Sequence, residues 1–177
     1  AGPSPLRPEV GGADALAAHV AQLKAQQPRN VVLAAGDLVS ASPMISAFFH
    51  DEPTVEALNA IGVEFSAAGN HEFDRGVPEL LRLQHGGCKP GDGVPDPNSC
   101  RGSTAAPFAG ANFQWLAANV IDTARAAPLL PPWAVKRFDG VDLAFVGVTL
   151  RSTPNVVMPS AVAGLRFDDE ADAVNAL

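Results

Sequence analysis

The chain has 177 residues, enough for a single domain with a sizeable hydrophobic core. Its formal net charge is -7 and it has no block of Lys or Arg, so binding to the backbone of a nucleic-acid polymer is not expected. No apolar stretch is long enough to span a bilayer. With 16 Gly and 16 Pro, many turns should separate the secondary-structure elements.

Hydrophobic spacing predicts helices that alternate with short strands over the first two thirds of the chain. Leu16, Val20 and Leu23 recur at helical intervals, whereas NVVLAA is typical of a buried strand. In chain order, we expect a helix over 13–27, a strand over 30–35, helices over 43–49 and 53–61, a strand over 63–67, a helix over 77–83 and a strand over 115–120. This alternation favours an α/β fold with functional groups at the carboxyl ends of the strands.

The sequence pattern of the last third of the chain predicts a β-hairpin and a final helix. Two strands, 133–138 and 141–148, flank Asp139-Gly140, a dipeptide that is typical of a tight hairpin turn. The segment 167–177 is expected to start a helix. We find no internal repeat and no clear domain boundary, so one layered α/β domain is the simplest interpretation.

Residues 86–110 are expected to form an insertion without hydrophobic periodicity, and both cysteines of the chain lie in it. Cys88 and Cys100 flank KPGDGVPDPNS, a loop rich in Pro, Gly and Asp. Because free cysteines prefer apolar surroundings, this pattern favours a disulfide and an oxidising compartment over two unrelated thiols. Closing a loop of this length would stabilise the fold by roughly 2–3 kcal/mol.

The segment GDLVSASP, residues 36–43, places a carboxylate directly after the first expected strand. Asp37 could bridge two cations there, which two-metal hydrolases hold about 3.5–4 Å apart. Gly36 lets the backbone turn without a Cβ clash. The alternative is that Asp37 caps the following helix. Taken alone, this segment favours a helix-capping role for Asp37, but a second polar segment makes the metal-binding role the preferred one.

That second segment is GNHEFD, residues 69–74. Asn70 offers an amide oxygen to a metal, and His71 can donate to a phosphate oxygen or to a leaving group. Asp74 shares a face with His71 three residues earlier, so it can orient and charge the imidazole. Glu72 is expected to brace the loop. The alternative is a solvated turn capped by Asn70, but carboxylate, amide and imidazole groups at strand ends are what a hard divalent metal site needs.

GDLVSASP followed by GNHEFD 33 residues later resembles the calcineurin-like metallophosphoesterases, and within them the 5'-nucleotidase group. FAGANFQWLAANV at 108–120 and the stretch 141–170 are similar to further segments of that group, so the resemblance covers nearly the whole chain. It implies an α/β (α+β) fold with a layered β-sandwich core flanked by helices. The cysteine-containing insertion resembles those of secreted bacterial members.

The resemblance also implies roles for individual residues. Asp37 would bridge two divalent metal ions (Zn, Mn, Mg or Ca, an identity that the sequence leaves open), and Asn70 would ligate one of them. His71 and Asp74 would form the catalytic dyad. Asn119 matches a motif asparagine that we expect to be structural.

Other parts of the family's site have no counterpart in this sequence. The Asp-x-His motif of the family's first strand does not precede Asp37, and no histidine follows His85 to supply downstream metal ligands. The C-terminal nucleotide-specificity domain is missing as well. We therefore expect residues 1–177 to be an internal fragment of a catalytic domain, with weak or no metal binding of its own.

Three functions remain open. The parent protein is expected to be a secreted, periplasmic or cell-wall-associated hydrolase of nucleoside 5'-monophosphates or related nucleotides. Alternatively, it is another ester hydrolase of the same fold, such as a 2',3'-cyclic phosphodiesterase or a sulfur-ester hydrolase. The third interpretation is an inactive folded piece or binding module. A small nucleotide is the expected partner, rather than a nucleic-acid polymer or a membrane, and the oligomeric state is left open.

Overall fold

The computed structural model describes residues 11–91, 96–100 and 107–177, and the chain divides into two compact units, Ala1–Asn30 and Val31–Leu177. The first unit contains α1 (Ala13–Gln26), which confirms the first expected helix. Its Leu16 and Leu23 side chains are exposed. Neither α1 nor any other helix in the described ranges combines the length and apolarity needed to cross a membrane.

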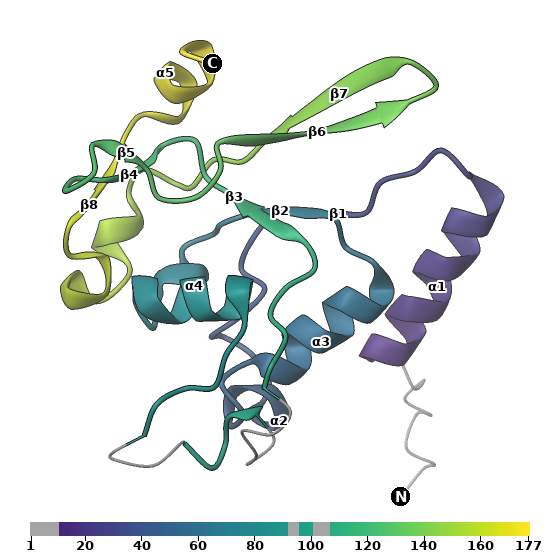
Figure 1. Cartoon of the computed structure of the whole chain (residues 1–177), viewed down its shortest axis with the longest axis horizontal. Helices are drawn as coiled ribbons and strands as arrows, with labels where there is room; N and C mark the ends of the chain where they lie inside the picture. The colour runs from purple at the N-terminus through teal and green to yellow at the C-terminus, as the bar shows by residue number, and fades with distance from the viewer. Residues whose placement is uncertain (1–10, 92–95, 101–106) are drawn as a thin grey trace, which may run out of the picture. The chain divides into compact units, whose positions relative to one another are not determined.

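Three short parallel strands form the first sheet of the second unit (Figure 1). These strands are β1 (Leu33–Ala34), β2 (Phe65–Ala67) and β3 (Gln114–Leu116), with β2 in the middle. β1 and β2 confirm the first two expected strands, although each is shorter than expected. Because parallel strands point the same way, the polar segments that follow β1 and β2 begin at the same edge of the sheet.

Helices connect these strands and supply much of the core. α2 (Met44–Ala47) and α3 (Glu52–Ile61) lie between β1 and β2, and α4 (Val77–His85) lies between β2 and β3. All three confirm expected helices. The buried apolar residues of α3 and α4 belong to the core, as does Trp115 of β3, and include Val55, Leu80 and Leu83. A single 3₁₀ turn, η1 (His71–Phe73), precedes α4.

The prediction of a single strand over 115–120 is wrong, because two separate strands, β3 and β4 (Val120–Asp122), occupy this region with an irregular segment between them. The fully buried Asn119 lies at this break. Its Nδ2 donates to the carbonyls of Thr149 (2.6 Å) and Asp168 (2.9 Å), and its Oδ1 accepts from Thr149 N (2.8 Å). These bonds satisfy a buried amide and turn the backbone out of the first sheet. Asn119 thus has the structural role that we expected.

β4 instead belongs to an antiparallel sheet that the sequence did not reveal. It lies between β5 (Ala127–Pro128) and β8 (Leu165–Phe167). Two further 3₁₀ turns, η3 (Thr153–Asn155) and η4 (Pro159–Val162), precede β8. The expected final helix is α5 (Glu170–Asn175), and its N-cap is Asp169, whose side chain accepts from two backbone N–H groups of the first turn.

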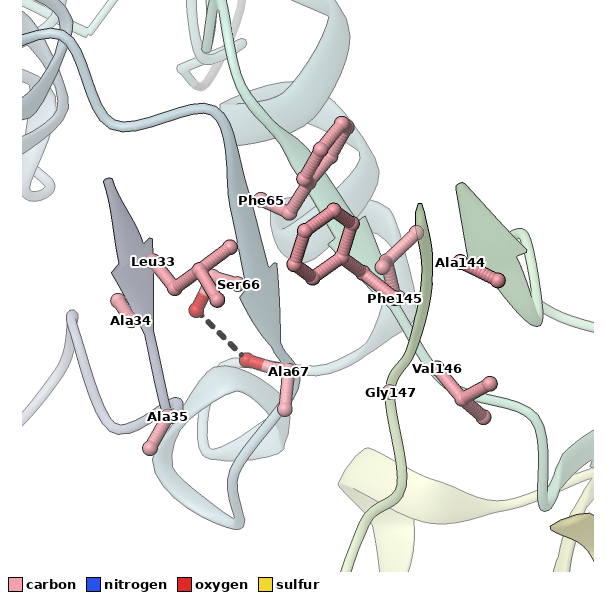
Figure 2. A pocket seen from close by; sticks show the side chains of 11 residues that line it. Leu33, Ala34, Ala35, Phe65, Ser66, Ala67, Ala144, Phe145, Val146 and Gly147 are labelled. Atoms are coloured by element: carbon pink, nitrogen blue, oxygen red, sulfur yellow. Dashed lines mark hydrogen bonds between the residues drawn. The ribbon is translucent and has the colours of Figure 1, made fainter. Parts of the chain in front are cut away.

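β6 (Trp133–Phe138) and β7 (Val141–Val146) confirm the expected hairpin. Its turn residues Asp139 and Gly140 both have positive φ, at 46° and 88°, as a two-residue hairpin of this type requires. Phe145 stacks on Phe65 of β2 with ring centroids 5.4 Å apart, so the hairpin contacts the first sheet. Figure 2 shows the two rings facing each other.

A cavity of about 380 Å³ lies beside this aromatic contact, between β1, β2 and the segment 144–147 (Figure 2). Its lining consists mainly of apolar side chains from these strands, and none of the polar residues singled out by the sequence takes part in it. The helices, the two small sheets and the hairpin together confirm the expected α/β (α+β) class.

Candidate functional site

The two polar segments converge just beyond β1 and β2, and their backbones touch. Gly36 has φ +92°, and a Cβ added there would lie 2.5 Å from Gly69 N and 3.1 Å from Ala67 O. A side chain on Gly69 would overlap the carboxylate of Asp37. Glycine at both positions therefore permits this close approach, and at Gly36 it also permits the left-handed backbone.

Asp37 reaches from the first loop to the second. Its Oδ1 accepts a hydrogen bond from His71 N at 3.1 Å, and the residue is exposed. The alternative role as a helix cap is not what the structure shows, because α2 begins after Pro43 and has no side-chain cap. Asp37 has φ 57°, a left-handed conformation that is uncommon outside glycine. The surrounding contacts must hold it there.

His71 and Asp74 form a close pair on the turn that follows β2. His71 Nδ1 lies 2.6 Å from Asp74 Oδ2, and the spacing i, i+3 places both side chains on one face of the 3₁₀ turn. The hydrogen bond with Asp74 raises the pKa of the His71 imidazole above its usual 6.5; partial burial opposes the shift, and the charges of Asp74, Asp37 and Glu72 add to it. Among the described residues, none bonds to Nε2, which leaves this nitrogen open to a ligand.

The raised pKa predicts a measurable titration in the metal-free protein. An NMR titration should give His71 a pKa above 6.5, and Asp74→Asn should lower it toward that value. Since the folded-state pKa is raised, the associated stabilisation is fully present below pH 6.5 and is lost as the pH rises through the raised value. Solvent screening keeps this effect on stability small. An unchanged His71 pKa in Asp74→Asn would show that the pair does not charge the imidazole.

Glu72 lies between these two side chains in sequence but points into the protein, where it is 3% exposed. Its carboxylate accepts from three backbone N–H groups, Asp37 at 2.8 Å, Leu38 at 2.8 Å and Gly69 at 2.7 Å. Burial raises the pKa of the Glu72 carboxyl above its ordinary value, although the three N–H donors act in the opposite direction. Glu72 thus braces both loops, whereas the sequence indicated only one.

Two side-chain oxygens of the loops fit a hard divalent cation in part. Asn70 begins the 3₁₀ turn, and within the described ranges its side-chain amide has no protein partner, nor does the second carboxylate oxygen of Asp37. Carboxylate and amide oxygens are the ligands that Mg²⁺, Mn²⁺ and Ca²⁺ prefer. No group of three or more His, Cys, Asp or Glu side chains in the described part of the chain could hold a metal ion. Asp37 and Asn70 could supply two oxygen ligands, and water or further groups would occupy the remaining coordination positions.

One buried carboxylate near the first loop was not found from the sequence. Asp51 is fully buried and accepts from Ser40 N (2.9 Å), Ser42 Oγ and Ser46 Oγ (3.1 Å). It lies 11 residues after Ser40 in a left-handed conformation, with φ 61°. No local pattern signals this role, because the donors come together only when the loop has folded.

The expected disulfide is present, with 5.3 Å between the Cα atoms of Cys88 and Cys100. Buried charge ties this part of the insertion to the helices. Glu52 accepts from Ser99 Oγ (2.5 Å) and Cys100 N (2.8 Å), and it pairs with Arg82 (2.7 Å). The crosslink and the buried ion pair thus hold the same loop.

We predict that replacing both cysteines, Cys88→Ser with Cys100→Ser, lowers the free energy of unfolding by about 2–3 kcal/mol. The physical reason is the larger freedom of the unfolded chain once the loop is open. Urea denaturation would measure the loss, and peptide mapping without reductant should find the crosslinked peptide in the wild type. Equal denaturation midpoints, or two free thiols after native purification, would contradict this prediction.

Residues 9–122 match the family model described as calcineurin-like phosphoesterase. A protein of Acinetobacter calcoaceticus, named only by its gene neighbourhood, is 45% identical over 140 residues, which make up 77% of this chain and 65% of that protein. The endonuclease YhcR of Bacillus subtilis is 36% identical over 93% of this chain and 13% of its own. The cell wall protein Lmo0130 of Listeria monocytogenes is 33% identical over 93% of this chain and 22% of its own. More distant relatives include a 5'-nucleotidase of Vibrio cholerae, 26% identical over 84% of this chain and 22% of its own.

Solved structures share the fold. The NAD nucleotidase of Haemophilus influenzae superposes with a TM-score of 0.70 at 23% identity, over 94% of this chain and 25% of the other. The sulfate thiohydrolase SoxB of Thermus thermophilus gives a TM-score of 0.71 at 23% identity, over 94% of this chain and 27% of the other. The chain thus spans about a quarter of each of these two proteins.

Proposed function

The chain belongs to the calcineurin-like phosphoesterase family, and from this premise we propose that the protein containing it hydrolyses phosphate esters with divalent metal ions. The observation that carries the proposal is the meeting of the two loops. Asp37 accepts from His71 N, while Asp74 holds the His71 imidazole with Nε2 open. A carboxylate, an amide and an oriented imidazole thus lie on two loops that meet at one edge of the sheet.

In this proposal, each residue has one task. Two divalent metal ions, when bound, neutralise the phosphate and provide a reactive water at neutral pH. Asp37 would hold the ions through its carboxylate, and Asn70 would contribute its amide oxygen to one of them. Asp74 accepts from Nδ1–H and orients the ring, and its charge favours the imidazolium form of His71. In that form Nε2 also carries a proton, which it can donate to a phosphate oxygen or to the leaving group.

The substrate we propose is a nucleoside 5'-monophosphate or a related small nucleotide. The 5'-nucleotidase among the relatives supports this class, at low identity. A 2',3'-cyclic phosphodiesterase and a sulfur-ester hydrolase remain the alternatives within the same fold. We further propose that residues 1–177 are part of a catalytic domain, with 86–110 as an insertion, and that the missing metal ligands and specificity residues come from outside this chain.

The relative named as an endonuclease, at 36% identity, favours a second candidate. Its name points to cleavage of the phosphodiester backbone of a polymer. Against this stands the net charge of -7, which repels a polyanion. Small nucleotides therefore remain the first proposal, and a nucleic-acid substrate is the second.

A location outside the cytoplasm follows from different observations. The Cys88–Cys100 disulfide is typical of an oxidising compartment, and one relative is named as a cell wall protein. We propose that the protein is secreted, periplasmic or attached to the cell wall. Cell fractionation with an antibody against the chain would test this, and a purely cytoplasmic signal would overturn it.

The activity test compares four substrates with the protein that contains this chain, in the presence of Mn²⁺. The substrates are AMP, 2',3'-cyclic AMP, a sulfur ester and a supercoiled plasmid. Turnover of AMP that stops on chelation supports the first proposal, whereas nicking of the plasmid without release of phosphate from AMP supports the second. His71→Asn serves as the control for a contaminating phosphatase. No hydrolysis of any of them would overturn the proposal.

For the isolated chain, we predict that residues 1–177 bind Mn²⁺ weakly and in a single equivalent at most. Asp37 and Asn70 alone would leave most coordination positions to water, which a hard cation accepts only at low affinity. Calorimetric titration with Mn²⁺ would measure this. Tight binding of two ions per chain would show that the ligand set is complete without any further segment.

A further inference from the structure

The buried carboxylate of Glu72 joins two loops that are more than 30 residues apart in sequence. Its Oε2 accepts from Asp37 N and Gly69 N, and its Oε1 accepts from Leu38 N. No cation pairs with Glu72 in the described part of the chain. The carboxylate thus has only backbone partners, and these come from both sides of the candidate site.

The position of Glu72 is itself fixed from the core side. Phe73, the next residue of the 3₁₀ turn, is fully buried and makes an edge contact with Phe167 at 5.4 Å. His71, the preceding residue, is partly exposed and pairs with Asp74. The turn therefore directs three consecutive side chains differently: His71 toward solvent, Glu72 into the joint between the loops and Phe73 into the core.

Two of the three hydrogen bonds surround Asp37. The N–H groups of Asp37 and of Leu38 lie on either side of the Asp37 Cα, so one carboxylate holds the peptide units before and after it. Asp37 has φ 57°, a conformation that persists in non-glycine residues only when neighbouring contacts impose it. In that conformation the Asp37 side chain reaches His71 N.

We propose that Glu72 is a positioning residue that holds Asp37 in the orientation required for metal binding, without touching metal or substrate. The proposal rests on the metal-dependent function proposed above. It adds that both motifs act as one unit because a single carboxylate accepts from each of them. Loss of these bonds should free the backbone at Asp37 and weaken the metal site, while His71 and Asp74 keep their own contact.

The test variant is Glu72→Gln, which keeps the size of the side chain. Three N–H groups point at the two carboxylate oxygens, so a Gln amide must turn its own NH₂ toward at least one of them and lose that bond. The matched control is Glu79→Gln. Glu79 is also buried, at 7% exposed, but its carboxylate pairs with Arg82 and Lys89 and accepts no hydrogen bond from the described residues of either loop.

Two measurements distinguish a positioning role of Glu72 from a role in fold stability alone. In the metal-free protein, hydrogen exchange of the segment 36–40 should be faster in Glu72→Gln than in Glu79→Gln or the wild type. In the same full-length protein, the affinity for Mn²⁺, followed by electron paramagnetic resonance, should fall by about 10–100-fold, the usual cost of losing a partner that orients a metal ligand. Turnover of AMP should recover in part at saturating Mn²⁺, with the KM for AMP nearly unchanged.

Wild-type Mn²⁺ affinity in Glu72→Gln, or an equal loss of affinity in Glu79→Gln, would overturn the proposal. If Glu72→Gln does not fold, Glu72→Asp is measured in the same way, since it keeps the charge but shortens the reach. Failure of both to fold, while Glu79→Gln folds, would assign Glu72 to folding alone and overturn it as well. A wild type without Mn²⁺ binding or phosphatase activity would instead overturn the proposed function, while the exchange measurement would still report whether Glu72 holds the loop.

Discussion

Replacing His71 by Asn should lower the turnover of phosphate-ester hydrolysis by about 10²–10³-fold and leave the metal content nearly unchanged. The loss is that of one preorganised donor aimed at charge that develops in the transition state. Nδ1 of the imidazole is bonded to Asp74. The hydrogen bond of His71 with Asp37 is made by the backbone N–H of His71 and not by its ring. Because that N–H remains in the variant, the bond to Asp37 should persist.

Turnover of AMP and the metal content of the same preparation are the two quantities to measure. Asp74→Asn should give a smaller loss of turnover than His71→Asn, since it changes only the orientation and pKa of the imidazole. His85→Asn is a matched control, because His85 is an exposed histidine at the end of α4. If His71→Asn strips the metal or leaves turnover intact, the assigned role is wrong even though the family is right.

Local spacing was sufficient for much of the fold. The helices follow from apolar residues at helical spacing. In α3 these include Val55 and Ile61, which are buried in the core, whereas Leu16 and Leu23 of α1 are exposed. The hairpin follows from Asp139-Gly140, where both residues adopt positive φ. In each case the signal lies within one element, so neighbouring residues contain all the information that the prediction needs.

The errors arose where a distant partner decides the local structure. The strand expected over 115–120 stops because Asn119 bonds with Thr149 and Asp168, which lie 30 and 49 residues further on. The short strands β5 and β8 exist only because β4 pairs with them. No period within a single segment reports such pairing.

The same distinction holds for the candidate site. The i, i+3 spacing of His71 and Asp74 predicted their contact, which the structure contains. The reach of Glu72 to Asp37 and Leu38, 35 and 34 residues earlier, could not be predicted beyond a general bracing role. Asp51 was missed for the same reason, since its donors, Ser40, Ser42 and Ser46, lie on a loop and a short helix that precede it by 5 to 11 residues. The roles of Asp37, Asn70, His71 and Asp74 in metal binding and catalysis stay predictions.

Replacing Asp37 by Asn should remove bound metal and activity together, which separates it from His71→Asn. The change removes the negative charge of the carboxylate that we propose to bind both metal ions. The loss of metal affinity should therefore exceed about 10–100-fold, which is the usual cost of losing a residue that only orients a metal ligand. The fold should tolerate it for two reasons. Asparagine occupies the left-handed region more readily than most residues, which suits φ 57°, and its amide oxygen can still accept from His71 N.

Metal analysis after dialysis against limiting Mn²⁺, together with turnover of AMP, would measure both losses. Asp142→Asn is the matched control, because Asp142 is an exposed aspartate of the hairpin that pairs with Arg137, far along the chain from both motifs. Asp142→Asn removes the same charge as Asp37→Asn but at a position away from both motifs, so metal content and turnover should both stay unchanged. If Asp37→Asn retains both metals and only slows turnover, the bridging role belongs to another carboxylate. In that case the contact between Asp37 and His71 N would serve to shape the loop rather than to hold metal.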